Sequence, residues 1–220
     1  DINYHNILLR CSLQTNNIER KILFSSKLRE KKEINLLKPY LKNGGTFVDI
    51  GANVGYYSLM AAQMGAKKVL SFEPNRAALS RFEFNVNVNG FNHIIDALPI
   101  ALGAKRHEAT MTASPDDLGA GTLVKNCVVG ETFTVSVERI DEVLFERGIK
   151  KIDALKIDVE GYEDEALIPL LDCPIETMPK FIIIEHGHSD LWGENIINLL
   201  LGKNYILSGK TRSNTFLKQM

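Results

Sequence analysis

Short apolar runs alternate with helix-like stretches along most of this chain, starting at residue 46. Four of the runs have the length and composition of buried strands, and they are residues 46–50, 68–72, 153–157 and 180–184. The helices predicted between and after them are residues 54–64, 76–88, 162–171 and 196–201. Residues 94–102 are predicted to be extended, with Pro99 weakening the run, and the chain finishes in two more apolar pieces at residues 205–207 and 215–217. Strands that alternate with helices favour an α/β doubly wound fold with a mostly parallel sheet covered on both faces.

Residues 1–43 differ from this pattern. They are polar and rich in Asn at first, then strongly charged, with Ile34, Leu37 and Leu41 at helical spacing. Asn43-Gly44-Gly45 is typical of a helix end. We therefore expect residues 1–43 to be an N-terminal helical segment that packs on a core domain formed by residues 44–220.

A second departure lies at about residues 103–139. This stretch alternates Thr and Val with apolar or polar neighbours, as in residues 132–137, and Gly and Pro-Asp pairs interrupt it. The pattern predicts a small antiparallel insertion in the α/β framework. Two interpretations stay open at this point: an element that covers the substrate, and an ordinary extension of the sheet edge.

Composition narrows the function classes. The 220 residues carry 26 basic and 27 acidic side chains, and this near balance counts against a dedicated nucleic-acid binder. No apolar run reaches the roughly 18 residues that cross a bilayer, and no signal-peptide pattern is seen. The three cysteines, Cys11, Cys127 and Cys173, lack C-x-x-C spacing, so we expect no disulfide framework, no zinc site and a cytoplasmic location. Whether residues precede Asp1, and which oligomeric state the chain adopts, stay open.

The junction of the first strand and its helix carries a glycine turn, Asp49-Ile-Gly51-Ala-Asn-Val-Gly55. Gly51 and Gly55 allow a tight turn and the close approach of a ligand to the backbone. Glu73 directly follows the second strand, where an acid accepts hydrogen bonds from both hydroxyls of a ribose. The combination predicts a cofactor that contains a nucleoside.

The spacing of the glycines separates two such cofactors. A dinucleotide needs G-x-G-x-x-G, whereas this turn reads G-x-x-x-G with Asp49 in front of it. A carboxylate there repels a pyrophosphate but suits the cationic amino-acid part of S-adenosylmethionine, either directly or through water. The charge argument therefore favours S-adenosylmethionine over NAD.

Two later strand ends carry ionisable groups. The segment Leu155-Lys-Ile-Asp-Val-Glu-Gly-Tyr-Glu163 places Lys156, Asp158 and Glu160 on one side of an extended stretch. The next apolar strand ends in Glu185-His186. Because the carboxyl ends of parallel strands flank the ligand crevice, we expect both groups near the cofactor.

Four segments in this order resemble the FkbM family of S-adenosylmethionine-dependent methyltransferases: "FVDIGANVGYYSLMAA", "SFEPN", "LKIDVEGYEDEAL" and "IIIEHG". The resemblance covers about residues 36–204 and implies the class I methyltransferase fold, a Rossmann-like sheet of seven strands whose last strand is antiparallel. Residues 205–207 and 215–217 would then form the closing pair. Members of the family are mainly O-methyltransferases that act on sugars, glycolipids, polyketides and related metabolites. The chain has Arg29-Glu30-Lys31 where the family often shows "yE".

The resemblance also implies roles for single residues. The methionine part of the cofactor would lie against Asp49, Gly51, Asn53 and Gly55. Glu73 would bind the ribose, and Ala101 and Leu102 would lie near the adenine. We assign Ala52, Tyr56 and Pro74 to the same site as their neighbours, and Asp158 would face the methyl group. Tyr56 and Tyr57 are candidates for the acceptor pocket, although aromatic side chains there are more often packing residues.

A hydroxyl acceptor is a weak nucleophile, so a base near it is expected to help. The candidates are Asp158, Glu160, Glu185 and His186, of which His186 has the best unperturbed pKa. Lys156 is interpreted as an ion-pair partner of Asp158 or Glu160, and His188 as a bystander.

A metal-assisted variant is the alternative to a simple base. Asp158, Glu185 and His186 would then hold a divalent ion that lowers the pKa of the acceptor hydroxyl. No fixed ligand spacing in the sequence demands this, so we predict no metal.

Three functions are compared. The first is an O-methyltransferase for a small-molecule or glycan acceptor, the second a nicotinamide-dependent oxidoreductase, and the third a non-catalytic nucleoside-binding module. The missing G-x-G-x-x-G argues against the second, and turnover separates the first from the third. The acceptor itself cannot be identified from the sequence.

Overall fold

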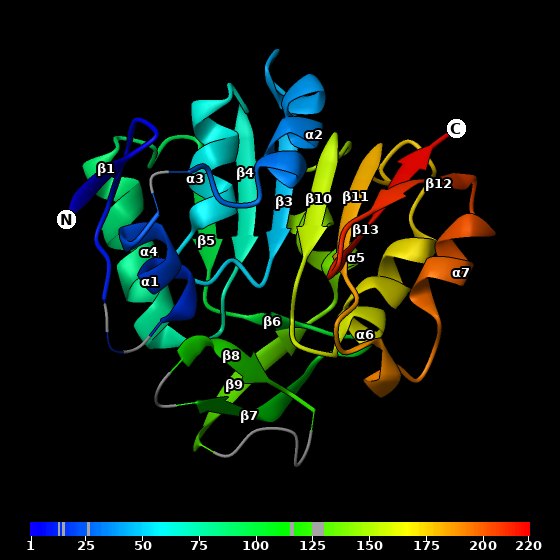
Figure 1. The fold of residues 1–220 in the computed structure, drawn as a ribbon. Coiled ribbons are helices and arrows are strands. Elements are labelled where there is room, and N and C mark those ends of the chain that lie inside the picture. Colours follow the sequence, from blue (N-terminus) through cyan, green and yellow to red (C-terminus); the bar gives the residue numbers. More distant parts are fainter. Residues whose placement is uncertain (13, 15, 26, 115–116, 125–129) are drawn as a thin grey trace.

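The computed structural model describes residues 1–12, 14, 16–25, 27–114, 117–124 and 130–220. A twisted central sheet stands between two layers of helices, and a smaller sheet lies across one end of it (Figure 1). Among the described residues, no helix is long and apolar enough to cross a membrane.

The central sheet has seven strands in the order β12-β13-β11-β10-β3-β4-β5. Their bounds are β3 Thr46–Ile50, β4 Lys68–Phe72, β5 Ile95–Leu98, β10 Ala154–Ile157, β11 Phe181–Glu185, β12 Tyr205–Lys210 and β13 Asn214–Gln219. The strands β5, β4, β3, β10 and β11 pair in parallel, whereas β13 is antiparallel to both β11 and β12. The doubly wound, seven-stranded fold with an antiparallel closing pair is therefore confirmed.

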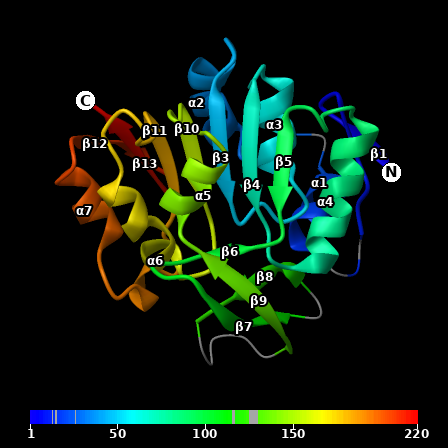
Figure 2. The same cartoon turned by 180° about the vertical axis from the view of Figure 1, so that it is seen from behind.

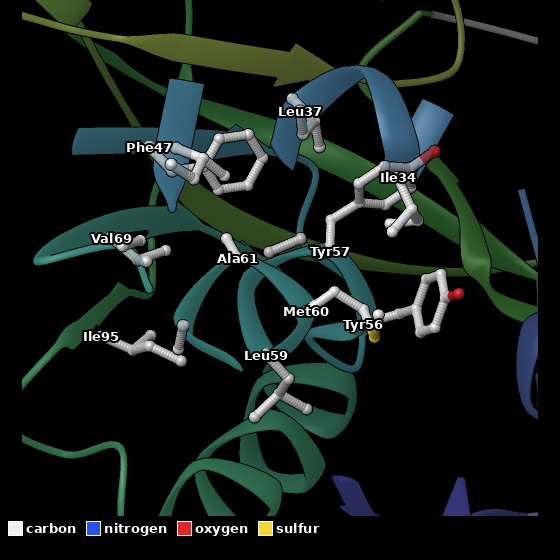
Figure 3. Close-up of a cluster of buried hydrophobic side chains, with 14 of the residues drawn as sticks. Ile34, Leu37, Phe47, Tyr56, Tyr57, Leu59, Met60, Ala61, Val69 and Ile95 are labelled. Atoms are coloured by element: carbon white, nitrogen blue, oxygen red, sulfur yellow. The ribbon is translucent and has the colours of Figure 1, made fainter. Parts of the chain in front are cut away.

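Alternating side chains of the strands face the two helical layers, because successive residues of a strand point to opposite faces. Phe47 and Val69 pack with α2 Lys31–Leu41, α3 Tyr56–Gln63 and α4 Arg76–Val88 in the cluster that Figure 3 shows in part. Val48 and Leu70 pack on the other face with α5 Ile140–Glu146, α6 Glu163–Leu167 and α7 Ile196–Leu201. Figures 1 and 2 show the two layers from opposite sides.

Two proline residues modify predicted elements. The helix expected over residues 162–171 is shorter, since α6 ends at Leu167 and a 3-10 turn, Ile168–Asp172, follows. Pro169 lacks the N–H that an α-helix needs there. The extended run 94–102 divides at Pro99 into β5 and a short strand β6, Ala101–Leu102, which leaves the central sheet.

The N-terminal segment is not wholly helical. It contains the expected helix α2 and a further helix, α1 Asn17–Leu23, but it begins with a hairpin of β1 Ile2–Tyr4 and β2 Ile7–Leu9. His5 and Asn6 both have positive φ, as a tight two-residue hairpin turn requires. A strand of three residues is too short for an alternation of apolar and polar residues to be detected in the sequence. The division of the chain at residue 43 stays a prediction.

The insertion forms a separate sheet of four strands in the order β6-β9-β7-β8. Its remaining strands are β7 His107–Ser114, β8 Asp117–Thr122 and β9 Glu131–Glu138, and β7 pairs antiparallel with both β8 and β9. The predicted antiparallel character is confirmed, while the Pro115-Asp116 pair and Cys127 lie outside the described residues. This sheet lies beyond the carboxyl ends of the parallel strands (Figure 2).

Candidate functional site

The glycine turn connects β3 to α3, and its glycines are required by protein packing. Gly51 has φ +75°, and a Cβ there would lie 1.9 Å from the carbonyl oxygen of Asp158. Gly55 has φ +85°, and a Cβ there would lie 2.0 Å from the ring of Phe82. That the glycines also allow a ligand to approach the backbone stays a prediction. The structure shows that the turn packs directly against the end of β10 and against α4.

A cavity of about 260 Å³ opens over the turn, at the carboxyl ends of β3, β4 and β10. Three parts of the chain line it: the strand ends, the N-terminal segment and the insertion. The predicted site residues among its walls are Gly51, Ala52, Asn53, Tyr56, Glu73, Pro74, Ala101, Leu102, Lys156, Asp158 and Glu160. Their roles stay predictions, but the fold brings these eleven to one cavity.

Four predicted residues are not among the described residues that line the cavity: Asp49, Gly55, Glu185 and His186. For Tyr57 the sequence allowed two interpretations, a residue of the acceptor pocket and a packing residue. Tyr57 lines the cavity and also belongs to the core cluster, where it is 7% exposed.

Glu73 is a buried acid at the tip of β4, only 6% exposed. Its carboxylate accepts hydrogen bonds from the backbone N–H of Asn53 at 2.7 Å and of Asn75 at 2.8 Å. Burial raises the pKa of Glu73 to about 7, against the lowering effect of these two hydrogen bonds. The remaining acceptor capacity of this fixed carboxylate suits the hydroxyls of a ribose. The site thus fits the nucleoside part of S-adenosylmethionine.

The pKa of Glu73 gives a testable pH dependence. Ribose hydroxyls that donate to Glu73 favour its ionised form, so binding lowers its pKa and is strongest above pH 7. We expect the affinity for S-adenosylhomocysteine to fall as the pH drops from 8 to 6. Glu73→Gln should weaken binding about tenfold at pH 8, which is about 1.4 kcal/mol, and flatten the profile. Calorimetry at both pH values measures this, and an equally steep profile in the variant would contradict the role of Glu73.

Asp49 lies beneath the turn and is not among the described residues that line the cavity, and its contact with the amino-acid part of the cofactor stays a prediction. It is fully buried and accepts a hydrogen bond from Ser58 Oγ at 2.5 Å. In register it lies between Lys156 of β10 and Ser71 of β4, so its side chain shares their face of the sheet. Burial raises the pKa of Asp49, and the nearby charge of Lys156 opposes that shift.

Lys156 connects this buried acid to the cavity. Its Nζ lies 3.3 Å from the carbonyl oxygen of Gly51 and 3.4 Å from Oδ2 of Asp158, and 5.2 Å from the ring centre of Tyr57. Burial by itself lowers the pKa of Lys156, but the carboxylates of Asp158, Asp49 and Glu30 outweigh it and raise the pKa overall. Lys156 therefore carries its charge at neutral pH and holds the glycine turn to the end of β10.

Carboxylates gather at the ends of β10 and β11. Burial, followed by repulsion from Asp158, raises the pKa of Glu160 to about 8 and that of Glu185 to about 7. One oxygen each of Asp158, Glu163 and Glu185 lie within 4.8 Å of one another, a set that can hold a divalent cation. The trio considered from the sequence had His186 in place of Glu163. Glu163 belongs to the charged strand end but was not predicted as a ligand, because its helix position does not show that it folds back to accept hydrogen bonds from Val159 N–H and Trp192 Nε1.

The two histidines after β11 lie in different surroundings, and their roles stay predictions. His186 Nδ1 lies 3.0 Å from Thr215 Oγ1 on β13, away from the cavity wall, and burial lowers its pKa. His188 Nε2 lies 3.1 Å from Oε2 of Glu160, which lines the cavity. A 3-10 turn, Ser189–Leu191, directly follows His188. The sequence carries no local signal for the contact between His188 and Glu160.

The N-terminal segment and the insertion supply walls that the sequence did not predict. They are Asn17, Ile18, Lys21, Arg29, Glu30, Met111, Asp117, Gly119, Gly121 and Leu123. Contacts over long stretches of chain hold them there: Asn16 Nδ2 donates to Asn53 Oδ1 at 2.8 Å, and Thr122 Oγ1 donates to the carbonyl oxygen of Glu160 at 2.9 Å. The insertion therefore lines the cavity, which favours the interpretation of an element that covers the substrate over a simple extension of the sheet edge.

Solved structures share the fold at low sequence identity. Methyltransferase FkbM from Methylobacillus flagellatus aligns with a TM-score of 0.55 and 20% identity, covering 79% of this chain and 43% of that protein. Precorrin-6y C5,15-methyltransferase from Geobacter metallireducens aligns with a TM-score of 0.54 and 10% identity, covering 100% of this chain and 98% of that one. Both are methyltransferases, and the likeness supports the fold.

Sequence comparisons identify the family. Methyltransferase sdnD of Sordaria araneosa is 30% identical over 150 residues, 54% of this chain and 58% of that protein. AMB antimetabolite synthetase AmbE of Pseudomonas aeruginosa is 24% identical over 180 residues, 65% of this chain but 8% of that protein. The chain thus spans less than two thirds of either relative. The model of the methyltransferase FkbM domain matches residues 49–207, from the glycine turn to β12. The chain therefore belongs to the FkbM family of methyltransferases, and its cofactor is S-adenosylmethionine.

Proposed function

We propose that this chain transfers the methyl group of S-adenosylmethionine to a hydroxyl of a small-molecule or glycan acceptor, such as a sugar, a glycolipid or a secondary metabolite. The relative named an antimetabolite synthetase supports an acceptor from secondary metabolism. The near balance of charges supports an acceptor other than nucleic acid. The proposal includes a cytoplasmic location, in keeping with the free thiols of Cys11 and Cys173.

One observation carries the proposal of a hydroxyl acceptor: Asp158 and Glu160 line the cavity together, and His188 lies against Glu160. A hydroxyl must lose its proton as it is methylated, so a positioned base accelerates the reaction by about 10² or more. Glu160 has φ +54°, a strained conformation for Glu, which turns its side chain into this arrangement with His188. A carboxylate that is aimed at the cavity and backed by an imidazole suits the removal of such a proton.

When bound, S-adenosylmethionine supplies a methyl group on a positively charged sulfur, ready for in-line displacement. The residues of the chain do the rest. Glu160 accepts the hydroxyl proton, and His188 Nε2 holds its carboxylate in place. Lys156 fixes Asp158 and the glycine turn, so that acceptor and donor meet in one orientation. The insertion and α1 add walls to the cavity and so reduce its contact with water.

A labelling experiment tests the reaction type. The protein is incubated with S-adenosylmethionine that carries a ¹³C methyl group and with fractions of glycans and secondary metabolites, and the products are identified by carbon NMR. We expect a methyl ether. A product methylated on nitrogen, sulfur or carbon would overturn the proposal.

Glu160→Gln should lower kcat by about 10² or more, while the affinity for S-adenosylhomocysteine changes little, because the variant loses the base but keeps the shape of the wall. Glu108→Gln on the exposed part of β7 is the matched control and should retain full activity. Steady-state kinetics and calorimetry on the same samples give both quantities. A variant that retains wild-type kcat would remove Glu160 from the reaction.

A further inference from the structure

Arg29 and Glu30 reach the cavity from the start of α2, although neither belongs to a motif of the strand ends. Two buried tyrosines hold the backbone of Arg29: its N–H donates to Tyr4 Oη at 2.9 Å, and its carbonyl oxygen accepts from Tyr56 Oη at 2.8 Å. Glu30 has φ +49°, which a side chain of this size adopts at a cost. The fold therefore maintains a strained pair of charged residues at the cavity.

The charges of this pair are only partly satisfied within the protein. Nη2 of Arg29 lies 2.9 Å from Oε1 of Glu30, and the side chains are 24% and 28% exposed. The Nε donor of Arg29 is buried and has no acceptor among the described residues. A buried guanidinium N–H without an acceptor costs free energy, so the fold keeps the Arg29 side chain beside the cavity at a cost.

The position of the pair indicates which part of the cofactor it would meet. Glu30 stands at the start of α2, and this helix packs against β10 and β11. Glu73 lies at the tip of β4, on the other side of β3. The pair thus faces the β10 side of the cavity, away from the ribose-binding acid. The part of S-adenosylmethionine farthest from the adenine is its amino acid, which carries an α-carboxylate and an α-ammonium group.

We propose that Arg29 and Glu30 together bind the amino-acid end of S-adenosylmethionine. Arg29 binds the α-carboxylate of the cofactor, and Glu30 binds its α-ammonium group. A cation and an anion side by side match a zwitterion, and the match is directional. The proposal rests on the cofactor of the family and is independent of the acceptor. It also gives the N-terminal segment a function in cofactor binding.

Two ligands that differ only at this end test the assignment. S-adenosylhomocysteine contains the amino acid, and 5′-methylthioadenosine lacks it. By calorimetry we expect the wild-type chain to bind S-adenosylhomocysteine much more tightly. Arg29→Gln and Glu30→Gln should each weaken the affinity for S-adenosylhomocysteine at least tenfold. Each should change the affinity for 5′-methylthioadenosine less than twofold. Retained binding of the second ligand also demonstrates that the variants are folded.

Lys31→Gln is the matched control, because Lys31 is an exposed cation that directly follows Glu30 on α2 and is not among the described residues that line the cavity. It should leave both affinities unchanged, whereas Glu73→Gln should weaken the binding of both ligands alike. An equal loss for both ligands in the Arg29 and Glu30 variants, no loss at all, or a selective loss only in Lys31→Gln would overturn the proposal. If the wild type bound neither ligand, the cofactor itself would be refuted, and this outcome is distinct from a failure of the O-methylation proposal.

Discussion

Replacing Gly51 with alanine is expected to destabilise the protein by about 3 kcal/mol or more and to abolish binding of S-adenosylhomocysteine. The left-handed backbone at φ +75° costs an alanine about 1–2 kcal/mol. The added Cβ would lie 1.9 Å from the carbonyl oxygen of Asp158, the residue after β10, so the backbone must move. Such overpacking costs roughly another 1–3 kcal/mol. The movement would displace Asp158 from the cavity. Unfolding in urea and calorimetry measure the two effects.

Gly90→Ala separates the two contributions. Gly90 has φ +71°, close to that of Gly51, but a Cβ there would meet nothing within 4 Å. We expect a loss of about 1 kcal/mol from backbone strain alone, with unchanged ligand binding. If Gly51→Ala cost no more than Gly90→Ala, the close packing of the turn against β10 would be wrong.

Replacing Lys156 with methionine is expected to cost about 3 kcal/mol of unfolding free energy at pH 8. The substitution keeps much of the volume but removes the cation next to the fully buried Asp49. Asp49 would then be a buried carboxylate without compensation, and its already raised pKa would rise further. Because the variant regains stability when Asp49 takes up a proton, the loss should shrink as the pH falls from 8 to 5. Unfolding in urea across this range measures it.

The double variant with Asp49→Asn tests the coupling. Its loss should be smaller than the sum of the single losses by more than about 1 kcal/mol, since the neutral amide removes the charge that Lys156 compensates. Lys151→Met is the surface control: Lys151 lies 3.3 Å from Asp153 with its side chain 55% exposed, and such pairs contribute less than about 1 kcal/mol. Strictly additive losses would show that Asp49 and Lys156 do not act as a pair.

Much of the fold could be predicted because its signals are local. The strands over residues 46–50 and 68–72 and the helix over residues 76–88 have their predicted bounds, and Asn75 caps that helix through hydrogen bonds to the backbone of Ala77 and Ala78. Buried parallel strands are continuous apolar runs, and a cap is one residue next to a periodic segment. The hairpin of residues 2–9 was missed, because strands of three residues have no periodicity to detect.

In the candidate site, too, the residues that could be predicted are those with a local signal in the sequence. Glu73, Asp158 and Glu160 were predicted from their place directly after an apolar strand, since parallel strands bring their carboxyl ends to one edge. The sequence did not show that Asp49 points to the face of the sheet that the helix α3 covers, where it accepts a hydrogen bond from Ser58. His186 and His188 are only two residues apart, and the turn after β11, not their spacing, decides which of them meets Glu160.

The sequence by itself determined the layered α/β sheet, the glycine turn and the acids at the strand ends, since each depends on neighbours within a few positions of the chain. The tertiary structure alone decided which residues enclose the cavity. Arg29, Glu30 and the insertion reach it through contacts such as those of Asn16 with Asn53 and of Thr122 with Glu160, which join residues 37 and 38 positions apart. Such contacts depend on how the finished sheet and its helices pack, and no local pattern in the chain encodes them.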